Sequence, residues 1–321
     1  MTYSKQVSLT CSGHTRPVIC LAHSGLTSEG YFMISGCKAG HPMLRKGETG
    51  DWIGTFHGHK GAVWGVTLSK DSFRAASASA DYTAKVWDTV TGDLLQTLEH
   101  KHIVKSVDFS YDCKKLLTAS NEKLLKVFDL KVNDDDYFSL EGHTASIKSS
   151  LWLNEYMIIS GSEDKTIRIW DTRNRAEFKQ VLVDSPITSL ELSHSYDLLL
   201  ATYGNTIAIY NATSLKLVKD IKWPVSLNSA SLHKDKSCIV AGGEDFKLYK
   251  IDYETGIELE SYKGHFGPVH CVNFSPDSEL YSSGSEDGTV RLWQTVPGKA
   301  YGLWKGEDNK AKTIPSIATD K

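Results

Sequence analysis

The sequence lacks the patterns that define several large classes of protein. Its six cysteines include no Cys-x-x-Cys pair, which argues against a disulfide framework and a cysteine-ligated zinc site and favours a reducing compartment. No apolar run approaches the roughly 18 residues that a transmembrane helix needs. The N-terminal stretch also lacks the apolar core of a signal peptide. We therefore expect no membrane insertion.

Motifs of common enzymes and cofactors are missing as well. The chain has no GxxxxGK(S/T) phosphate loop, no GxGxxG dinucleotide motif and no HExxH zinc motif. A formal net charge of −3 gives no electrostatic reason to expect binding to nucleic acid or to an anionic membrane. Metal-ligand spacing is absent among the histidines His41, His57, His100, His102 and His233. We expect no cofactor, no metal and no enzymatic activity.

The sequence instead contains short alternating apolar runs separated by Pro, Gly, Asp and Ser. The clearest stretch runs from Gly264 to Gln294, with a turn at Ser275-Pro276-Asp277 and a Gly-rich turn at Gly284 to Gly288. Period-2 runs of this length predict strands joined by tight turns. Such a small unit cannot bury both of its faces alone, so it needs similar neighbours.

The chain supplies these neighbours at a regular spacing. Stepping back from Trp293 gives equivalent positions at intervals of 42, 41, 40, 42, 41 and 42 residues. A Gly-His pair precedes four of the units, and an acidic residue lies six positions before the reference position in five of them. The reference positions are Arg45, Trp87, Phe128, Trp170, Tyr210, Ile251 and Trp293. This pattern is typical of WD40 repeats and predicts an all-β, seven-bladed propeller.

The ends of the chain bear on how the ring closes. We expect residues 1–305 to form the propeller and residues 306–321 to be a disordered polar tail. In each repeat the outer strand precedes the Gly-His pair, and Gln6–Cys11 has this position before Gly13-His14. This segment should therefore be the outer strand of the last blade. Tyr301–Trp304 is a competing candidate for the same edge.

Each complete blade holds a His, a Ser, an Asp and a Trp, which suggests a hydrolase at first sight. A catalytic triad, however, needs one exposed nucleophile beside an oxyanion hole, whereas this set occurs three times at the repeat period. In the WD40 family such residues form a buried hydrogen-bonded chain, and we expect the same structural role here. The sets are His59, Ser77, Asp81 and Trp87; His143, Ser160, Asp164 and Trp170; and His265, Ser283, Asp287 and Trp293.

Function should then lie at the mouth of the central channel, where WD40 proteins usually bind partners. Trp64 could anchor a partner or be tucked between blades. Three glutamates could form an acidic arc for a basic partner segment, or simply a solvated rim. The register places at this mouth the candidates Trp64, Lys105, Lys148, Glu163, Glu244, His270 and Glu286.

Several stretches go beyond the general repeat marks. DWIGTFHGHKGAVWGV, HKHIVKSVDF, AGGEDFKLYKI and the block ending in RLWQTVPGKAYGLWK resemble the serine/threonine kinase receptor-associated (unr-interacting) family of WD40 proteins. The resemblance covers Thr10 to Lys305. It implies a non-enzymatic adaptor of the cytoplasm and nucleus, acting in the survival-of-motor-neuron complex that assembles spliceosomal small nuclear ribonucleoproteins for mRNA splicing.

The same resemblance implies specific partners. These are Sm-like Gemin subunits, an unr-type RNA-binding protein, and the receptor kinases and inhibitory Smads of TGF-β signalling, with RNA contacted only indirectly and no DNA. We expect Tyr301 and Trp304 to make a family-specific contact, because two aromatics on an edge strand could extend a partner's sheet. The alternative is direct RNA recognition in translation or processing, with Trp64 stacking on a base and Lys105 and Lys148 on phosphates.

Overall fold

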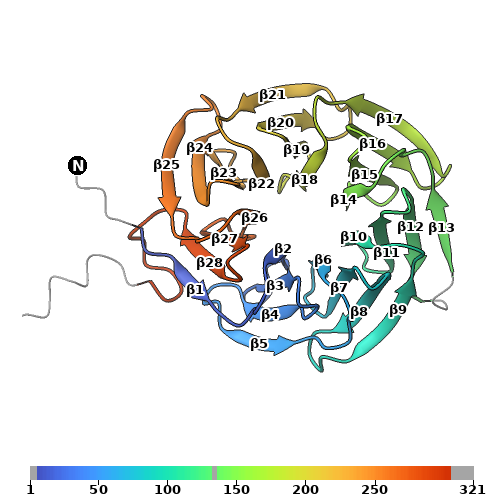
Figure 1. Ribbon diagram of the computed structural model, residues 1–321, viewed down its shortest axis with the longest axis horizontal. Coiled ribbons are helices and arrows are strands. Elements are labelled where there is room, and N and C mark those ends of the chain that lie inside the picture. The colour runs from blue at the N-terminus through green and yellow to red at the C-terminus, as the bar shows by residue number, and fades with distance from the viewer. Residues whose placement is uncertain (1–5, 132–135, 305–321) are drawn as a thin grey trace, which may run out of the picture.

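The computed structural model describes residues 6–131 and 136–304, and it is a closed ring of seven four-stranded antiparallel sheets (Figure 1). The all-β, seven-bladed propeller predicted from the repeat period is confirmed. The predicted tail at 306–321 lies outside the described residues. Within these residues, no helix has the length and apolar character that a membrane crossing requires.

Every blade is built from strands in the order inner, second, third, outer. Blades 1 and 2 consist of β2 (Val18–His23), β3 (Phe32–Cys37), β4 (Met43–Lys46), β5 (Trp52–Thr55), and β6 (Val63–Leu68), β7 (Arg74–Ser79), β8 (Thr83–Asp88), β9 (Leu94–Glu99). Blades 3 and 4 consist of β10 (Val104–Phe109), β11 (Lys115–Ser120), β12 (Leu125–Asp129), β13 (Tyr137–Leu140), and β14 (Ile147–Trp152), β15 (Met157–Ser162), β16 (Thr166–Asp171), β17 (Ala176–Leu182). Blades 5 and 6 consist of β18 (Ile187–Leu192), β19 (Leu198–Tyr203), β20 (Thr206–Asn211), β21 (Leu217–Lys222), and β22 (Leu227–Leu232), β23 (Cys238–Gly243), β24 (Lys247–Asp252), β25 (Glu258–Lys263). Blade 7 consists of β26 (Val269–Phe274), β27 (Leu280–Ser285), β28 (Val290–Gln294) and β1 (Leu9–Cys11).

The core lies between the blades. Each main apolar cluster joins residues of two neighbouring sheets, for example Ile159 and Ile169 of blade 4 with Leu199 and Ala201 of blade 5. Both faces of the middle strands are covered in this way, so β19 and β23 are buried along their whole length. Stacking of twisted sheets around a ring therefore buries apolar residues that one blade would leave exposed.

The ring closes through the N-terminal strand. β1 pairs antiparallel with β28, with Leu9 opposite Leu292 and Cys11 opposite Val290. Cys11 is buried in the cluster that joins blades 7 and 1. The prediction that the segment Gln6–Cys11 supplies the outer strand of the last blade is confirmed, with residues 9–11 forming the strand.

The competing expectation, an edge strand at Tyr301–Trp304, is wrong. This segment turns back on itself in a single bridge between Tyr301 and Trp304. β1 already occupies the edge of β28, and the Trp304 Nε1 donates to the Val7 carbonyl oxygen at 3.3 Å. Residues 301–304 therefore contact the chain just before β1 and do not extend the sheet.

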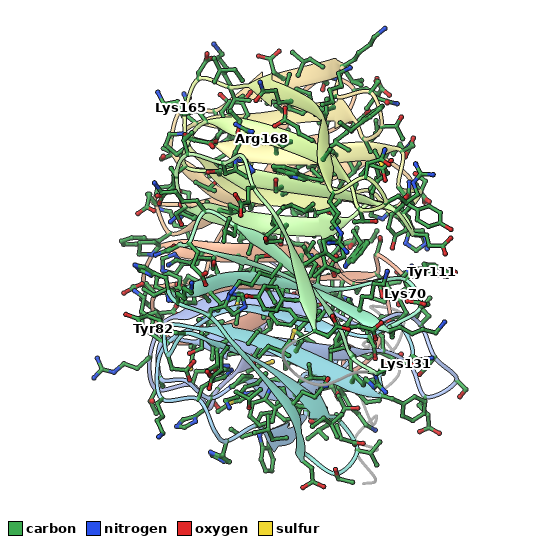
Figure 2. The ribbon with its side chains drawn as sticks, turned by 90° about the vertical axis from the view of Figure 1, so that its right-hand side faces the viewer. Lys70, Tyr82, Tyr111, Lys131, Lys165 and Arg168 are labelled. Atoms are coloured by element: carbon green, nitrogen blue, oxygen red, sulfur yellow. The ribbon has the colours of Figure 1, made fainter. Side chains whose placement is uncertain are left out.

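The two faces of the ring carry different turns. The upper face holds the connections into each inner strand and the turns between second and third strands; the lower face holds the turns between first and second strands. In the edge-on view of Figure 2, the face called upper is on the left, with Tyr82 and Lys165, and the face called lower is on the right, with Lys70 and Tyr111.

Removal of β1 should weaken the whole ring. Deletion of residues 2–11 exposes the edge of β28 and the apolar surface that Leu9 and Cys11 cover. Burial of one apolar side chain contributes about 1.5–3 kcal/mol to the free energy of unfolding. We expect the midpoint of thermal unfolding to fall by several degrees and aggregation to increase, as measured by calorimetry and light scattering. Deletion of residues 2–5 is the control; equal midpoints for the two deletions would contradict the closing role of β1.

Candidate protein-binding site

The repeated His, Ser, Asp and Trp residues form one hydrogen-bonded chain in each complete blade. In blade 2, Trp87 Nε1 donates to Ser77 Oγ at 2.9 Å, and Ser77 Oγ lies 2.7 Å from His59 Nε2. His59 Nδ1 lies 2.8 Å from an Asp81 carboxylate oxygen. Blades 4 and 7 repeat this geometry within 0.1 Å. The Ser hydroxyl is fully used within this buried chain, so it has no access to a substrate.

The carboxylate at the end of each chain is held in its charged form. Burial alone would raise the pKa of Asp287, but hydrogen bonds from the Phe266 N–H, from Thr289 and from His265 lower it to about 2. Burial lowers the pKa of His265, and the hydrogen bond to Asp287 opposes this only in part. The pair is therefore a neutral imidazole beside a carboxylate at neutral pH, with Nδ1–H donating to the carboxylate.

Blades 1 and 3 depart from the pattern. In blade 3, Phe128 replaces Trp, and the Nε2 of His100 is buried without a partner among the described residues. In blade 1, Arg45 replaces Trp and its guanidinium donates to the carbonyl oxygens of Ser12 and Gly50. Burial and the Arg45 charge lower the pKa of His14 to about 4. In blade 3 the buried chain is replaced by a network in which Glu122 contacts both His100 and Lys126.

Breaking the chain of blade 7 should destabilise the fold. In Asp287→Ala, the donors of His265, Phe266 and Thr289 lose their acceptor, and a stranded buried donor costs about 1–3 kcal/mol. We expect chemical denaturation to report a loss of this size. A denaturation midpoint equal to that of the native sequence would show that the chain does not stabilise the blade.

A β-bulge shapes the mouth of the channel at the upper face. In all seven inner strands the register shifts between the first and third residues, which leaves the second residue without a partner. A bulge of this kind re-aims the side chain of the extra residue. The seven bulged residues are Ile19, Trp64, Lys105, Lys148, Thr188, Asn228 and His270.

Four of the predicted candidates form one contiguous group at this mouth. The Lys105 ammonium lies 3.2 Å from the centre of the half-buried Trp64 ring. Burial and the nearby Lys148 charge lower the pKa of Lys105 to about 8, against the opposing effect of Glu163. Lys148 pairs with Glu163 at 2.7 Å. An aromatic ring, two cations and a carboxylate therefore follow one another along the mouth from blade 2 to blade 4.

The other two glutamates of the rim also have partners, one charged and one neutral. Glu286 contacts His270 at 2.6 Å and Lys38 at 3.2 Å. The Glu244 carboxylate accepts a hydrogen bond from the Asn228 side chain at 2.8 Å. Lys38 and Asn228 were not found from the sequence, because blade 1 lacks the turn acid and blade 6 lacks the Gly-His mark from which the register is counted. A basic partner would have to displace these contacts.

Tyr301 and Trp304 lie away from this group. The Tyr301 hydroxyl donates to the Asp277 carboxylate in a turn of the lower face, and its ring packs in the cluster between blades 7 and 1. The structure therefore gives them a role at the closure of the ring. A partner contact of Tyr301 or Trp304 stays a prediction.

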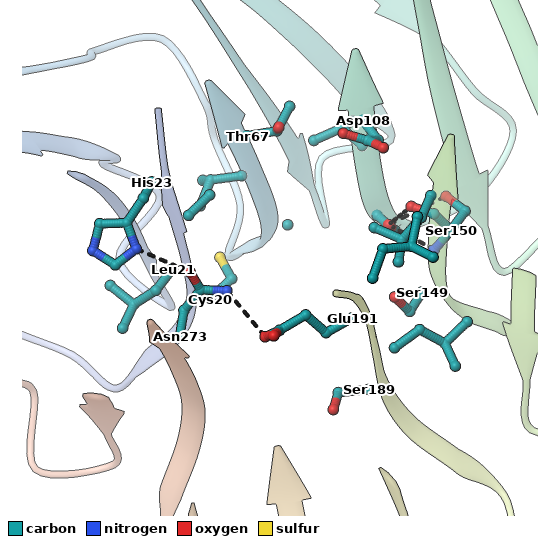
Figure 3. A pocket seen from close by; sticks show the side chains of 18 of the residues that line it. Cys20, Leu21, His23, Thr67, Asp108, Ser149, Ser150, Ser189, Glu191 and Asn273 are labelled. Carbon is teal, nitrogen blue, oxygen red and sulfur yellow. Dashed lines mark hydrogen bonds between the residues drawn. The ribbon is translucent and has the colours of Figure 1, made fainter. Parts of the chain in front are cut away.

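Polar side chains fasten the inner strands to one another inside the channel, which has a volume of about 840 Å³. Asp108 accepts a hydrogen bond from the Trp152 N–H of the next blade at 2.9 Å, and Glu191 accepts one from the Leu232 N–H at 3.0 Å. Inner strands have an unpaired edge that faces the channel, and these contacts satisfy it. Asn273 bridges Glu191 and His23, at 3.3 Å and 2.9 Å, so blades 5, 7 and 1 are joined (Figure 3).

Burial raises the pKa of both channel carboxyls, to about 7 for Asp108 and about 8 for Glu191, although hydrogen bonds oppose the shift. No three His, Cys, Asp or Glu side chains within residues 6–131 and 136–304 are grouped to hold a metal ion. The channel groups act between blades, and sequence reasoning missed them. Their signal was the run of Ser, Asp, Glu and Asn at alternating positions of otherwise apolar inner strands.

The Glu191 shift predicts a pH effect. Its folded-state pKa lies above the roughly 4.3 of an unfolded chain, so its contribution to stability is complete below pH 4 and is lost as the pH rises through about 8. A glutamine at this position does not titrate. We therefore expect the unfolding temperature of Glu191→Gln, minus that of the native sequence, to increase as the pH rises from 5 to 8.5. Glu163→Gln at the exposed rim is the control. A constant difference across this pH range would contradict the shift.

The repeat geometry agrees with comparisons to known proteins. The profile of the WD domain, G-beta repeat matches residues 50–88, 92–129, 135–171 and 256–294, which end on the third strands of blades 2, 3, 4 and 7. The chain is 59% identical to the serine-threonine kinase receptor-associated protein of Gallus gallus, over 99% of this chain and 93% of the chicken protein. The chain belongs to the serine-threonine kinase receptor-associated protein family.

Other relatives extend this family. Identity to the Homo sapiens serine-threonine kinase receptor-associated protein is 58%, covering 94% of this chain and 86% of that protein. Identity to the Dictyostelium discoideum member is 46%, covering 89% and 98%. A more distant relative, eukaryotic translation initiation factor 3 subunit I of Caenorhabditis briggsae, is 29% identical over 88% of this chain and 95% of that protein. The family resemblance expected from the sequence is confirmed.

Proposed function

We propose that this protein is a non-catalytic scaffold that binds protein partners at the upper mouth of its channel. The observation that carries this proposal is the ring of bulged residues, which directs side chains of different chemistry into one opening. Trp64 supplies an aromatic anchor, and Lys105, Lys148 and Glu163 around it supply charges that can exchange partners. The polar groups that resemble a catalytic triad are used up in the buried chains of the blades.

The finer part of the proposal concerns the partners. Because the family name describes association with a serine-threonine kinase receptor, we propose that the protein modulates receptor kinase and inhibitory Smad signalling of the TGF-β type. We further propose a subunit role in the survival-of-motor-neuron complex, in contact with Sm-like Gemin subunits and an unr-type protein, in cytoplasm and nucleus. The extent of the likeness to family members, nearly the full chain, supports both roles.

A second candidate function is direct RNA binding in translation. Trp64 next to Lys105 and Lys148 has the composition of a base-stacking site with flanking phosphate contacts. The distant relative named as a translation initiation factor subunit supports this candidate, and the net charge of −3 opposes it. Salt-dependent binding of a small nuclear RNA by the isolated protein would favour this function. An unchanged electrophoretic mobility of the RNA at low salt would exclude it.

The scaffold proposal predicts which surface captures partners. Trp64→Ala removes the anchor at the mouth, and hot-spot aromatics typically contribute about 2 kcal/mol or more, so Gemin-type and unr-type partners should be recovered at least about tenfold less in pull-downs from cell extract. Trp52→Ala is the matched control, because Trp52 is an exposed Trp on the outer strand of blade 1.

A chain truncated after Lys299 tests the Tyr301–Trp304 contact in the same assay. Partners that remain bound to this truncation but are lost from Trp64→Ala support the upper mouth. Partners retained by Trp64→Ala and lost on truncation would refute it.

A further inference from the structure

The lower face carries a cluster of exposed tyrosines that neither the fold nor the upper mouth explains. Tyr111, Tyr156 and Tyr196 come from the turns between first and second strands of blades 3, 4 and 5, and are 72%, 42% and 41% exposed. With Leu153, they line a groove of about 430 Å³. Grouped exposed aromatics are uncommon on a monomer surface and mark binding sites.

The tyrosine rings already hold a cation of the chain itself. Lys70, from the corresponding turn of blade 2, places its ammonium 4.0 Å from the centre of the Tyr111 ring and 4.9 Å from the centre of the Tyr196 ring. Because Tyr196 belongs to blade 5, this contact reaches over the lower mouth of the channel. Figure 2 shows Lys70 and Tyr111 side by side at this face. The faces of these rings are therefore positioned to bind a positive charge.

Tyr196 occupies a turn position that is left-handed in five blades. Its φ is 58°, and the corresponding residues of blades 2, 3, 6 and 7 have φ values of 67°, 53°, 56° and 60°, at Ser72, Cys113, Lys236 and Ser278. The left-handed conformation therefore belongs to the repeated turn between first and second strands, and a glycine at Tyr196 can keep this turn.

The groove brings charges of both signs beside its aromatic rings. Its lining includes the carboxylates of Asp112 and Glu155 and the ammonium of Lys115, and the Arg173 guanidinium lies 5.0 Å from the centre of the Tyr156 ring. Asp112 pairs with Lys114 at 3.0 Å, but both side chains are half-exposed, so this pair is weak. None of the ion pairs within residues 6–131 and 136–304 includes Glu155. An incoming cation would find aromatic faces beside an acceptor carboxylate.

We propose that this lower groove binds an arginine side chain of a partner peptide, which replaces Lys70 against the tyrosines. A guanidinium is planar, so it stacks on an aromatic ring and still directs N–H groups to the carboxylates at the edge. Lys70 is an exposed residue on a flexible stem and can swing into solvent. In the unbound protein Lys70 then acts as an internal competitor for the ring faces of Tyr111 and Tyr196.

This site shares no residue with the group at the upper mouth. The two proposals are therefore independent, and a scaffold with both sites can hold two partners on opposite faces of the ring. Trp64→Ala should leave binding at the lower groove unchanged, which separates a failure of one proposal from a failure of the other.

The test uses the full chain and a dye-labelled heptapeptide of alternating glycine and arginine, followed by fluorescence anisotropy. The same peptide with neutral citrulline in place of arginine measures the contribution of the charge. We expect the arginine peptide to bind, and the citrulline peptide to bind roughly threefold to thirtyfold more weakly, the range of a cation–π contact. No binding of the arginine peptide, or equal binding of both peptides, would overturn the proposal.

Three variants locate the site. Tyr111→Ala and Tyr196→Gly should each weaken binding of the arginine peptide severalfold, and the glycine relieves backbone strain, so the unfolding temperature should not fall. Tyr82→Gly is the matched control, because Tyr82 is an exposed tyrosine at φ 69° on the upper face. If Tyr82→Gly weakens binding as much as Tyr196→Gly, the lower groove is not the site.

Lys70→Ala gives the sharpest result. Loss of the internal competitor should strengthen binding of the arginine peptide, whereas an anionic ligand would lose a contact and bind more weakly. A single-stranded oligouridine serves as the anionic probe. Weaker binding of the arginine peptide by Lys70→Ala would overturn the proposal. Binding of oligouridine that depends on Lys70 and Tyr196 would replace it with an RNA site.

Discussion

The pairing of β1 with β28 is the contact on which the rest of the structure depends. Seven twisted sheets bury their apolar faces only against neighbours, so an open arc would leave two faces exposed. The N-terminal strand joins the last blade on its outer edge, and the bridge of Asn273 to His23 joins blade 7 to blade 1 inside the channel. The ring is thus fastened at its outer and inner circumference, with the cluster around Met33 and Leu280 between them.

The sequence predicted those features that repeat. The Trp87, Trp170 and Trp293 period gave the number of blades, and the Gly-His marks gave the outer strands and the buried polar chains. The period also identified Trp64, Lys105 and Lys148, because a count from the regular spacing of the repeats reaches the same position in each inner strand. It did not show that this position is a bulge, since an extra residue in one strand becomes visible only when its partner strand is in register.

Contacts between different blades could not be predicted in this way. Lys38 meets Glu286 and Glu191 meets Asn273 across large separations in sequence, and no repeat mark connects them. For this reason the spacing identified the glutamates of the rim but not their partners. The turn at Tyr301–Trp304 was missed because two aromatics beside a Gly fit a short strand or a tight turn equally well. The lower groove depends on side chains of three blades, so sequence spacing gave no indication of it.

The closing strand also sets the order of events during synthesis. Gln6 donates to the Gln294 carbonyl oxygen, a contact between residues 288 positions apart. During translation the first strand emerges before its partner exists, and it must wait until nearly the whole propeller has been made. Contacts of such long range are slow to form, and unpaired strand edges are prone to aggregate in the interval. A chain that stops before β28 can stack its early blades but cannot become a ring, so every incomplete product keeps an open edge for chaperones or proteases to recognise.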